Sequence, residues 1–382
     1  MMNTKFQDQG ARHILYCKKC LMPTSRPRIS FDENGVCNAC KNALYKQNIN
    51  WKEREQELLT LLEKYRSSKN PWDCIVTWSG GKDSSTVAWK LKYEYDMNPL
   101  LLTYSPMIPT EVGNHNREMM IQAGFNHLFY RPDQKVHRQL AKRFFIERGN
   151  PKTPWDAGVS VLPTIIAIRF KIPIIFHAEH GESEYGGKVL REDSSKIRDY
   201  TEIVEHQIGD DPMNWVDHTH IKEKDIASYT YPDHKKVEDV GVKAYYFSNF
   251  QKWDPVSNFY YIRQKINFRT CEQGRTEGTF TNFDSLDDKI DNLYYYMQYI
   301  KFGFGRAIRD ASRQIQNGHI SRDEGVKLSK LYDHEFPRKY FDEVLEYLQL
   351  NENDFYNIVD KHRNPEIWEQ KNNKWMLRFP IE

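Results

Sequence analysis

Long uninterrupted apolar runs are missing from this 382-residue sequence. No stretch approaches the roughly eighteen consecutive apolar residues of a membrane-spanning helix, and residues 1–20 lack the apolar core of a signal peptide. An excess of one charge is missing as well, because 55 Lys and Arg residues stand against 53 Asp and Glu residues, a formal net charge of +2. We therefore expect a cytoplasmic protein without membrane insertion. The balanced charge makes nucleic acid an unlikely general partner.

Cysteine is scarce, and four of the six cysteines form one pattern. Cys17 and Cys20 make a first Cys-x2-Cys pair, and sixteen residues separate it from the second pair, Cys37 and Cys40. Two such pairs are typical of a zinc ribbon, in which four thiolates surround one structural Zn²⁺ and leave no position open for catalysis. An iron–sulfur cluster and two disulfides are the alternatives, although disulfides fit poorly with a reducing compartment.

Length and composition predict several domains. With 39% hydrophobic and 14% aromatic residues, the chain can bury a large core. We expect a zinc ribbon at residues 1–50, a linker helix at 51–69, an α/β domain at 70–250 and a mainly helical region at 251–382. Residues 1–70 contain thirteen Lys and Arg against seven Asp and Glu. A local basic excess of this kind can bind RNA, an acidic partner or an anionic substrate, or it can simply form a solvated face.

Strand and helix patterns alternate between residues 70 and 250. Strands are predicted at residues 74–78, 99–104, 127–130, 172–177 and 243–247. Helices between them are predicted after the first strand and at residues 113–123, 135–148 and 159–170. Later helices are predicted at residues 285–299, 305–316, 322–332, 341–348 and 352–361. The alternation predicts an α/β fold with a parallel sheet, whose ligands bind at the carboxyl ends of the strands.

A glycine turn follows the first predicted strand and precedes a helix. It consists of Ser79, Gly80, Gly81, Lys82, Asp83, Ser84 and Ser85. Adjacent glycines let backbone N–H groups approach a phosphate, and the first helical turn adds free donors and a positive dipole end. The serines offer hydroxyl groups, Lys82 supplies charge and Asp83 can hold Mg²⁺. The spacing is not that of a Walker A loop, and an ordinary strand–turn–helix connection is the alternative.

A second candidate segment follows the fourth predicted strand. Residues 178–187 contain three glutamates, one histidine and three glycines, and should meet the glycine turn at the same sheet edge. Glu182 and Glu184 join Lys82 and Asp83 as the predicted catalytic residues, because positions i and i+2 of an extended loop point the same way. The two glutamates would hold Mg²⁺ or act as a general base. His180 is a candidate substrate-binding residue or a structural histidine, and a glycine-rich acidic surface loop is the alternative for the whole segment.

The glycine turn resembles the SGGxDS loop of the ATP pyrophosphatase (PP-loop) superfamily. The resemblance implies a parallel-sheet core of the adenine nucleotide alpha hydrolase-like type, in which the loop holds the β and γ phosphates of ATP as pyrophosphate. It also implies that ATP is split between its α and β phosphates, so that a substrate oxygen becomes adenylylated. Backbone groups near Tyr104, at the end of the second predicted strand, would take the adenine.

The combined motifs narrow this resemblance to one family. YCKKCLMPT at residues 16–24, SGGKDS at 79–84 and HGESEYGG at 180–187 occur in that order, similar to the N-acetyl sugar amidotransferases of WbpG type. FGFGRA at residues 302–307 and NGHISRDE at residues 317–324 also resemble segments of this family. Such enzymes act in bacterial surface-glycan biosynthesis, for lipopolysaccharide O-antigen or flagellin glycan. The resemblance implies conversion of an acetamido group on a UDP-linked sugar into an acetamidino group with ATP and ammonia. Arg306 is the candidate for the sugar nucleotide's diphosphate, since guanidinium binds phosphate bidentately and its loop opens a helix.

No glutaminase motif occurs in the sequence, because neither Cys74 nor Cys271 lies in a glycine-rich nucleophile elbow. We therefore expect a separate glutaminase subunit to supply ammonia, with a cyclase-like barrel partner as the channel that the resemblance implies. Two other functions stay open. One is a tRNA-modifying PP-loop enzyme, either a thiolase or a lysidine-type ligase. A thiolase needs a persulfide-carrying cysteine, and Cys74 and Cys271 are poor candidates for that role. A noncatalytic zinc-ribbon scaffold is the other, and Lys82 and Asp83 argue against it.

Overall fold

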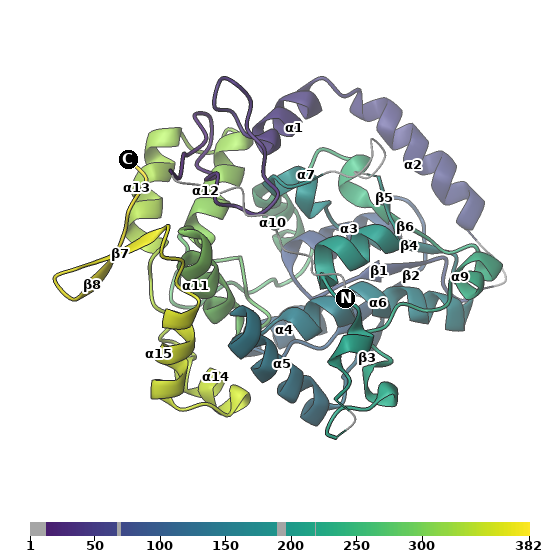
Figure 1. Cartoon of the computed structure of the whole chain (residues 1–382). Coiled ribbons are helices and arrows are strands. Elements are labelled where there is room, and N and C mark those ends of the chain that lie inside the picture. The colour runs from purple at the N-terminus through teal and green to yellow at the C-terminus, as the bar shows by residue number, and fades with distance from the viewer. Residues whose placement is uncertain (1–12, 67–69, 189–195, 218) are drawn as a thin grey trace.

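A six-stranded sheet lies at the centre of the α/β domain (Figure 1). The computed structural model describes residues 13–66, 70–188, 196–217 and 219–382. The strand order is β3-β2-β1-β4-β6-β5, and all neighbours are parallel except β5 and β6. The strands are β1 (Cys74–Thr77), β2 (Pro99–Tyr104), β3 (Asn126–Tyr130), β4 (Ile174–His177), β5 (Ile197–Arg198) and β6 (Lys243–Tyr246). The predicted parallel α/β fold is confirmed, and the antiparallel edge strand β5 is a strand that the sequence did not indicate.

Helices cover both faces of the sheet. Successive residues of a strand point to opposite faces, so Cys74 and Val76 of β1 pack into one core while Ile75 packs into the other. The first core includes residues of α2 (Trp51–Tyr65), α3 (Lys82–Tyr93), α4 (Glu111–Gln122) and α10 (Pro255–Arg263). The second includes residues of α5 (Gln134–Arg148) and α6 (Thr153–Phe170). Across the described residues, none of the helices combines the length and the apolar character needed to span a bilayer.

Short helical segments connect the later strands. Between β4 and β6 these include α7 (Gly181–Tyr185), α8 (Tyr200–Glu202) and α9 (His234–Val240). Strands β4 and β1 are parallel neighbours, so their carboxyl ends lie next to each other. The glycine turn after β1 and the acidic segment after β4 therefore share one edge of the sheet, as predicted.

The C-terminal region is mainly helical. Its helices are α11 (Asp291–Phe302), α12 (Arg306–Gln316), α13 (Arg322–Tyr332), α14 (Phe341–Leu348) and α15 (Glu352–Lys361). It docks on the α/β domain through ring contacts such as Phe145 of α5 against Phe355 of α15, whose centroids are 5.8 Å apart. Two differences from the sequence-based prediction stand out. Ser285 has a positive φ of 52°, which a right-handed helix cannot contain, so the helix predicted from 285 begins at 291. A hairpin of β7 (Trp368–Lys371) and β8 (Lys374–Leu377) follows α15, where the sequence indicated no strand.

The N-terminal segment lies against the C-terminal helices. In Figure 1 its purple loop runs beside α12 and α13, and it continues into α1 (Asn38–Gln47). Leu21 and Met22 pack with Phe304 and Ile308 in one apolar cluster. The N–H of Leu21 also donates to Ser312 Oγ at 3.1 Å. The ribbon is thus docked on residues almost three hundred positions away in the sequence.

Candidate active site and metal centre

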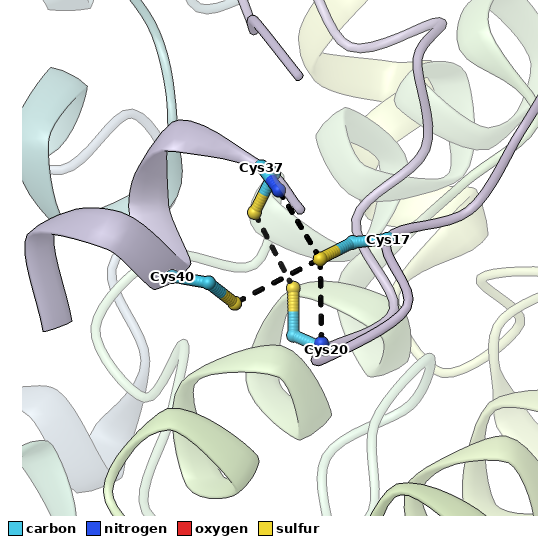
Figure 2. Close-up of side chains that lie close together, drawn as sticks. All are labelled: Cys17, Cys20, Cys37 and Cys40. Carbon is cyan, nitrogen blue, oxygen red and sulfur yellow. Dashed lines mark hydrogen bonds between the residues drawn. The ribbon is translucent and has the colours of Figure 1, made fainter. Parts of the chain in front are cut away.

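The four patterned cysteines meet in one buried cluster (Figure 2). Sγ atoms of Cys17 and Cys40 are 3.8 Å apart, and those of Cys20 and Cys37 are 3.6 Å apart, too far for disulfides. Bonds of about 2.3 Å to one tetrahedral Zn²⁺ would place the sulfurs about 3.8 Å apart, whereas in an iron–sulfur cluster the irons separate the sulfurs further. The N–H groups of Lys19 and Cys37 donate to Cys17 Sγ at 3.4 and 3.3 Å, which stabilises a thiolate. The cluster can therefore hold one four-coordinate metal ion.

The glycine turn has the geometry of an anion site. Gly80 has a φ of +95°, and a Cβ there would lie 2.6 Å from Cγ of Arg117, so the position requires glycine. Gly81 is the N-cap of α3, which has no side-chain cap, so donors of its first turn remain available. Ser79 Oγ accepts from the N–H of Gly81 at 3.1 Å, and Ser84 Oγ accepts from the N–H of Ser79 at 3.4 Å. These two bonds fix the conformation of the turn.

Three of the residues predicted to bind ATP, Gly80, Ser85 and Tyr104, do not line the cavity that the other five line. Ser85 is fully buried, and its Oγ accepts a hydrogen bond from Trp78 Nε1 at 2.8 Å. This corrects the expectation that its hydroxyl faces a phosphate, because on α3 it falls on the face that packs into the core. The ring of Tyr104 is buried beside Tyr130 and His137. The expectation for Tyr104 concerned backbone groups at the strand end and stays a prediction.

A cavity of about 420 Å³ lies where the turn and the segment after β4 meet the C-terminal region. Its volume is within the range of about 300–1,000 Å³ usual for small-molecule sites. From the turn it is lined by Ser79, Gly81, Lys82, Asp83 and Ser84. Its other charged lining residues are Lys152, Asp156, Glu179, Asp254, Asp284, Asp287, Asp291, Arg306, Arg309, Asp310 and Arg313. The cavity therefore joins the carboxyl ends of two parallel strands to residues that the C-terminal helices supply.

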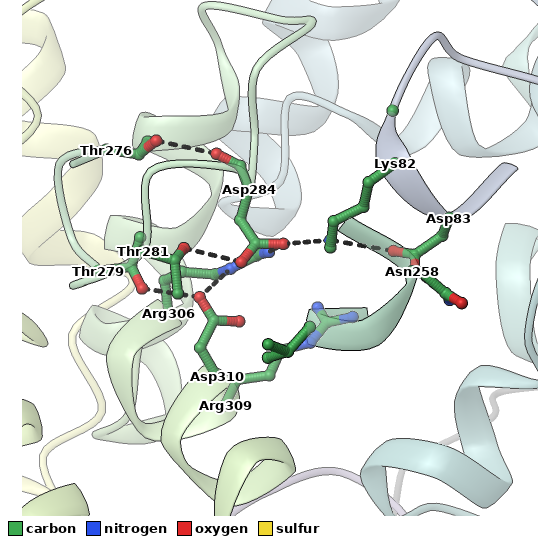
Figure 3. Close-up of polar contacts among 12 residues, drawn as sticks. Lys82, Asp83, Asn258, Thr276, Thr279, Thr281, Asp284, Arg306, Arg309 and Asp310 are labelled. Carbon is green, nitrogen blue, oxygen red and sulfur yellow. Dashed lines mark hydrogen bonds and ion pairs between the residues drawn. The ribbon is translucent and has the colours of Figure 1, made fainter. Parts of the chain in front are cut away.

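A chain of ion pairs crosses this cavity (Figure 3). Lys82 Nζ is 3.0 Å from Asp83 Oδ2 and 2.6 Å from Asp284 Oδ1. Asp284 Oδ1 is also 3.1 Å from Arg306 Nη2, and Arg306 Nε is 2.8 Å from Asp310 Oδ2. Burial alone would lower the pKa of Lys82, but Asp284 and Asp83 raise it above its ordinary value. Burial would raise the pKa of Asp284, but Lys82 and Arg306 hold it well below its usual range. Lys82 and Asp284 are thus charged at neutral pH, and the chain of ion pairs links the turn to α12.

The start of α12, predicted as a phosphate site, is already occupied by a carboxylate. Asp333 accepts hydrogen bonds from the N–H groups of Gly305 at 2.7 Å and Ile308 at 2.9 Å. Arg306 does line the cavity, but its guanidinium is paired with two aspartates. Neither the helix start nor Arg306 offers the free positive charge that the sequence suggested.

The predicted catalytic glutamates are turned toward the ribbon. Residues 181–185 form the short helix α7, so the expected extended loop is wrong. Glu182 is bound by Arg28, with Nη2 to Oε1 at 2.6 Å and Nε to Oε2 at 3.0 Å. Glu184 forms an ion pair with Lys46 of α1. Both carboxylates are buried and neither lines the cavity. The ribbon's excess basic charge is thus used partly to dock it on α7.

Glu179 lies in the cavity, where Glu182 and Glu184 were expected. It follows β4 almost directly and lines the cavity, and Tyr185 Oη donates to its Oε1 at 3.3 Å. Burial, followed by the nearby charge of Asp83, raises the pKa of Glu179. His180 is instead fully buried, with Nε2 2.8 Å from Glu202 Oε1. Its surroundings are those of a structural histidine, so the substrate-binding role expected for it finds no support.

The sequence-based selection chose Arg306 of α12 but missed Arg309 and Arg313 on the same helical face. Arg306, Arg309 and Arg313 are spaced i, i+3 and i+7 and therefore share one helical face. Arg313 Nη2 is 2.8 Å from Glu184 Oε2. Arg309 Nη1 donates to Tyr295 Oη at 3.3 Å. Within the described part of the chain Arg309 forms no ion pair, and the spacing alone could have indicated this face.

The pKa of Asp156, in the first turn of α6, is raised by its surroundings. Burial, the largest cause, and the nearby Asp291 raise its pKa from 3.8 to about 7, although Lys152 opposes the shift. Between these values the folded chain holds a proton that the unfolded chain has released, so stability falls as the pH rises through this range. We expect Asp156→Asn to unfold at a higher temperature than the wild type at pH 8 and to lose that advantage near pH 4.

Thermal unfolding followed by circular dichroism at both pH values measures this difference. Asp239→Asn on α9 is the matched control, because Asp239 is exposed and lies outside the cavity. Its unfolding temperature should differ little from that of the wild type at either pH. A variant of Asp156 that is no more stable than the wild type at pH 8 would contradict the expectation.

The chain is an α/β protein whose mainly parallel sheet carries an SGGKDS turn after β1, the arrangement expected from the resemblance to PP-loop proteins. Residues 277–379 match the family described as "LPS biosynthesis protein WbpG-like, C-terminal domain". This region is thus a WbpG-like C-terminal domain, and the resemblance to WbpG-type proteins is confirmed. The matched region contributes Asp284, Arg306, Arg309 and Arg313 to the cavity.

Solved structures of three other proteins are similar to parts of this chain. A predicted tRNA methyltransferase subunit from Methanocaldococcus jannaschii is 22% identical over 44% of this chain and 73% of its own, with a TM-score of 0.24. NMN synthetase from Francisella tularensis is 13% identical over 51% and 94%, with a TM-score of 0.27. The U34-tRNA thiolase NcsA from Methanococcus maripaludis with its [4Fe-4S] cluster is 12% identical over 80% and 89%, with a TM-score of 0.22. A search of curated proteins gives no match.

Proposed function

We propose that this chain is an ATP-dependent amidotransferase that converts the acetamido group of a UDP-linked sugar into an acetamidino group in bacterial surface-glycan biosynthesis. AMP and pyrophosphate are its other products. One observation carries the proposal: the glycine turn of a PP-loop core and the arginine face of a WbpG-like C-terminal domain line the same cavity. The contact of 2.6 Å between Lys82 and Asp284 joins the two parts.

The turn side of the cavity suits the β and γ phosphates of ATP. The uncapped first turn of α3 offers N–H donors, and the ammonium group of Lys82, paired with Asp83 and Asp284, lies at the same helix start. A carboxylate is a preferred ligand of Mg²⁺, and Asp83, steadied by Asn258 Nδ2 at 2.8 Å from its Oδ1, lines the cavity beside the turn. Asp83 would hold the Mg²⁺, which when bound neutralises charge on the departing pyrophosphate.

The chemistry requires that an amide oxygen become a leaving group, because an amide carbonyl is a poor electrophile. The acetamido oxygen attacks the α phosphorus, the bond to the β-phosphate oxygen breaks, and pyrophosphate remains in the turn. Loss of the amide N–H proton gives an O-adenylyl imidate. Glu179 is the residue we assign to accept that proton, because it lines the cavity and burial raises its pKa above the ordinary value of a glutamate. Ammonia then adds to the imidate carbon, AMP leaves with the original oxygen, and the amidine remains.

Ammonia is proposed to come from a separate glutaminase subunit through a cyclase-like barrel partner, as the resemblance to the family implies. A free ammonium salt should replace both partners in a test of the isolated chain, because the adenylylated intermediate needs only the amine. This makes the chemical step testable without the partners.

Zinc is the metal that we propose for the cysteine cluster. The four thiols are soft ligands, and the sulfur separations of 3.6 and 3.8 Å match a single tetrahedral ion. Cysteines fill all four ligand positions, so the ion would be structural. The docking of the ribbon on α12 would set the distance between this ion and the cavity. Metal analysis of the purified chain should give one zinc per molecule.

The tRNA thiolase alternative requires a cysteine beside the bound ATP. Cys74 is fully buried in β1, where burial raises its pKa and keeps the thiol protonated. Cys271 lines a different cavity of about 550 Å³. Neither sulfur can therefore carry a persulfide to the glycine turn. A noncatalytic scaffold would not need the charged, concave lining around Lys82. The positions of the two cysteines and the charged lining around Lys82 therefore favour the amidotransferase.

The deciding experiment incubates the purified chain with ATP, Mg²⁺, ammonium chloride and a panel of UDP-linked acetamido sugars. Mass spectrometry should find a sugar nucleotide in which NH replaces one oxygen, formed together with equal amounts of AMP and pyrophosphate. Release of ADP and orthophosphate with the true substrate would overturn the proposal. ATP consumption that depends on a tRNA and on no sugar would favour the tRNA-modifying enzyme.

A further inference from the structure

We propose that Arg309 of α12 and Arg26 of the ribbon form a second anion site in the molecule, which binds the diphosphate of the sugar nucleotide while the glycine turn holds ATP. The identity of this ligand depends on the proposed function. The existence of the anion site follows from the distribution of charge alone.

The cavity's cations differ in whether a carboxylate neutralises them. Lys82 is paired with Asp83 and Asp284. Arg306 is paired with Asp284 and Asp310. Arg313, likewise, is paired with Glu184. Arg309 lines the same cavity without an ion pair to any residue that the structure describes. Its charge is therefore the one on this helical face that remains available to an incoming anion.

Aromatic rings hold the Arg309 guanidinium in place without neutralising it. Its central carbon lies 4.0 Å from the ring centre of Tyr185 and 5.7 Å from that of Tyr295. Nη1 donates to Tyr295 Oη at 3.3 Å. A guanidinium has five N–H donors in a fixed plane, so several remain for the oxygens of a phosphate group. A positioned, uncompensated guanidinium is the arrangement that binds phosphate bidentately.

Arg26 places a second guanidinium at the segment on which Arg309 packs, because Arg26 is bonded to Gly186 and Arg309 lies over the ring of the preceding residue, Tyr185. The Nε of Arg26 donates to the carbonyl of Gly186, and within the described residues this arginine forms no ion pair. Burial, followed by the like charge of Arg309, lowers the pKa of Arg26 to about 10. The neighbouring Glu182 is held by both Nε and Nη2 of Arg28. Two guanidiniums that repel each other are stabilised when an anion with two negative groups lies between them.

Arg309 comes from a different element than the residues proposed to hold the ATP phosphates. Figure 3 shows Lys82 and Asp83 at the start of α3, while Arg309 and Asp310 rise from α12 on another wall. In an adenylyl transfer the attacking oxygen must lie in line with the leaving pyrophosphate, on the far side of the α phosphorus. The second substrate therefore needs an anchor away from the turn, and Arg309 with Arg26 supplies it.

Calorimetric titration of the zinc-loaded full chain with UDP tests this assignment. α,β-Methylene-ATP is added first at saturation, so that the glycine turn is occupied and UDP reports the second site. We expect Arg309→Gln and Arg26→Gln each to weaken UDP binding about 10- to 100-fold, the usual loss for a charged hydrogen-bond pair. Affinity for α,β-methylene-ATP should stay within about twofold, since its phosphates contact neither residue. Arg309→Lys should recover part of the UDP affinity, because it keeps the charge but not the fork.

Arg54→Gln is the matched control, since Arg54 lies on α2 and its one ion pair among the described residues is with Glu57 of the same helix. It should bind UDP as the wild type does. Unchanged UDP affinity in Arg309→Gln would overturn the site, and so would a loss confined to the ATP analogue, which would mean that Arg309 serves ATP itself. If UDP binds through Arg309 but no amidine forms in the product assay, the proposed reaction fails while the anion site stands. If the Gln variant does not fold, the Lys variant with its preserved charge gives the same comparison.

Discussion

Lys82→Ala is expected to abolish release of AMP and pyrophosphate while the chain stays folded and retains its metal. The ammonium group lies at the start of α3 and is the turn's own positive charge toward the departing pyrophosphate. Losing such a preorganised group typically lowers kcat by about 10²- to 10³-fold. Folding should survive because the carboxylates that Lys82 leaves behind keep partners: Asp284 retains Arg306, and Asp83 retains Asn258.

Quenched-flow or coupled pyrophosphate assays measure this effect, with metal content and thermal unfolding determined on the same preparation. Lys92→Ala is the control, because Lys92 is on the same helix but outside the cavity, near the ring of Phe125. It should release pyrophosphate as the wild type does. Wild-type turnover by Lys82→Ala would remove the turn from the mechanism. Loss of metal together with activity would instead show that the variant had misfolded.

Features set by local sequence were predictable. Strand β2 and helices α13, α14 and α15 begin and end at the predicted residues. Short apolar runs and amphipathic periods specify such elements without reference to the rest of the chain. The capping box of Ser321 and Glu324 shows why the start of α13 was clear. The glycine turn was equally local, because a positive φ at Gly80 and an uncapped helix start depend on adjacent residues.

Features set by distant contacts were not predictable. Asp284 approaches Lys82 across 202 positions of sequence, and no local pattern marks it among the aspartates of its loop. Glu182 and Glu184 were assigned to the cavity on the assumption of an extended loop. Their real orientation depends on Arg28 and Lys46 of the ribbon, which attract both carboxylates away from the turn. The same contacts leave Glu179 as the glutamate that faces the cavity.

Removal of the ribbon's metal, by chelation or by Cys37→Ser, is expected to damage the sugar-nucleotide site as well as the ribbon. A small four-cysteine segment depends on its metal for folding energy, with apparent values of about 10–16 kcal/mol in zinc-finger peptides. α12 contacts the cluster on one side, where Gln316 Nε2 donates to Cys40 Sγ at 3.6 Å, and lines the cavity with Arg309 and Arg313 on the other. Unfolding of the ribbon would also remove Arg26 from the proposed anion site.

The two ligands should therefore respond differently to metal loss. UDP binding should weaken by at least about tenfold, because a guanidinium contact and the support of α12 are both lost. The affinity for α,β-methylene-ATP should change less, since the glycine turn is held by β1 and α3 of the α/β domain. Calorimetry of both ligands, with metal content and unfolding temperature measured in parallel, separates these effects. Cys271→Ser controls for loss of a thiol, because Cys271 lies in another cavity. Metal-free protein that binds UDP as tightly as the zinc-loaded chain would show that the ribbon has no part in that site.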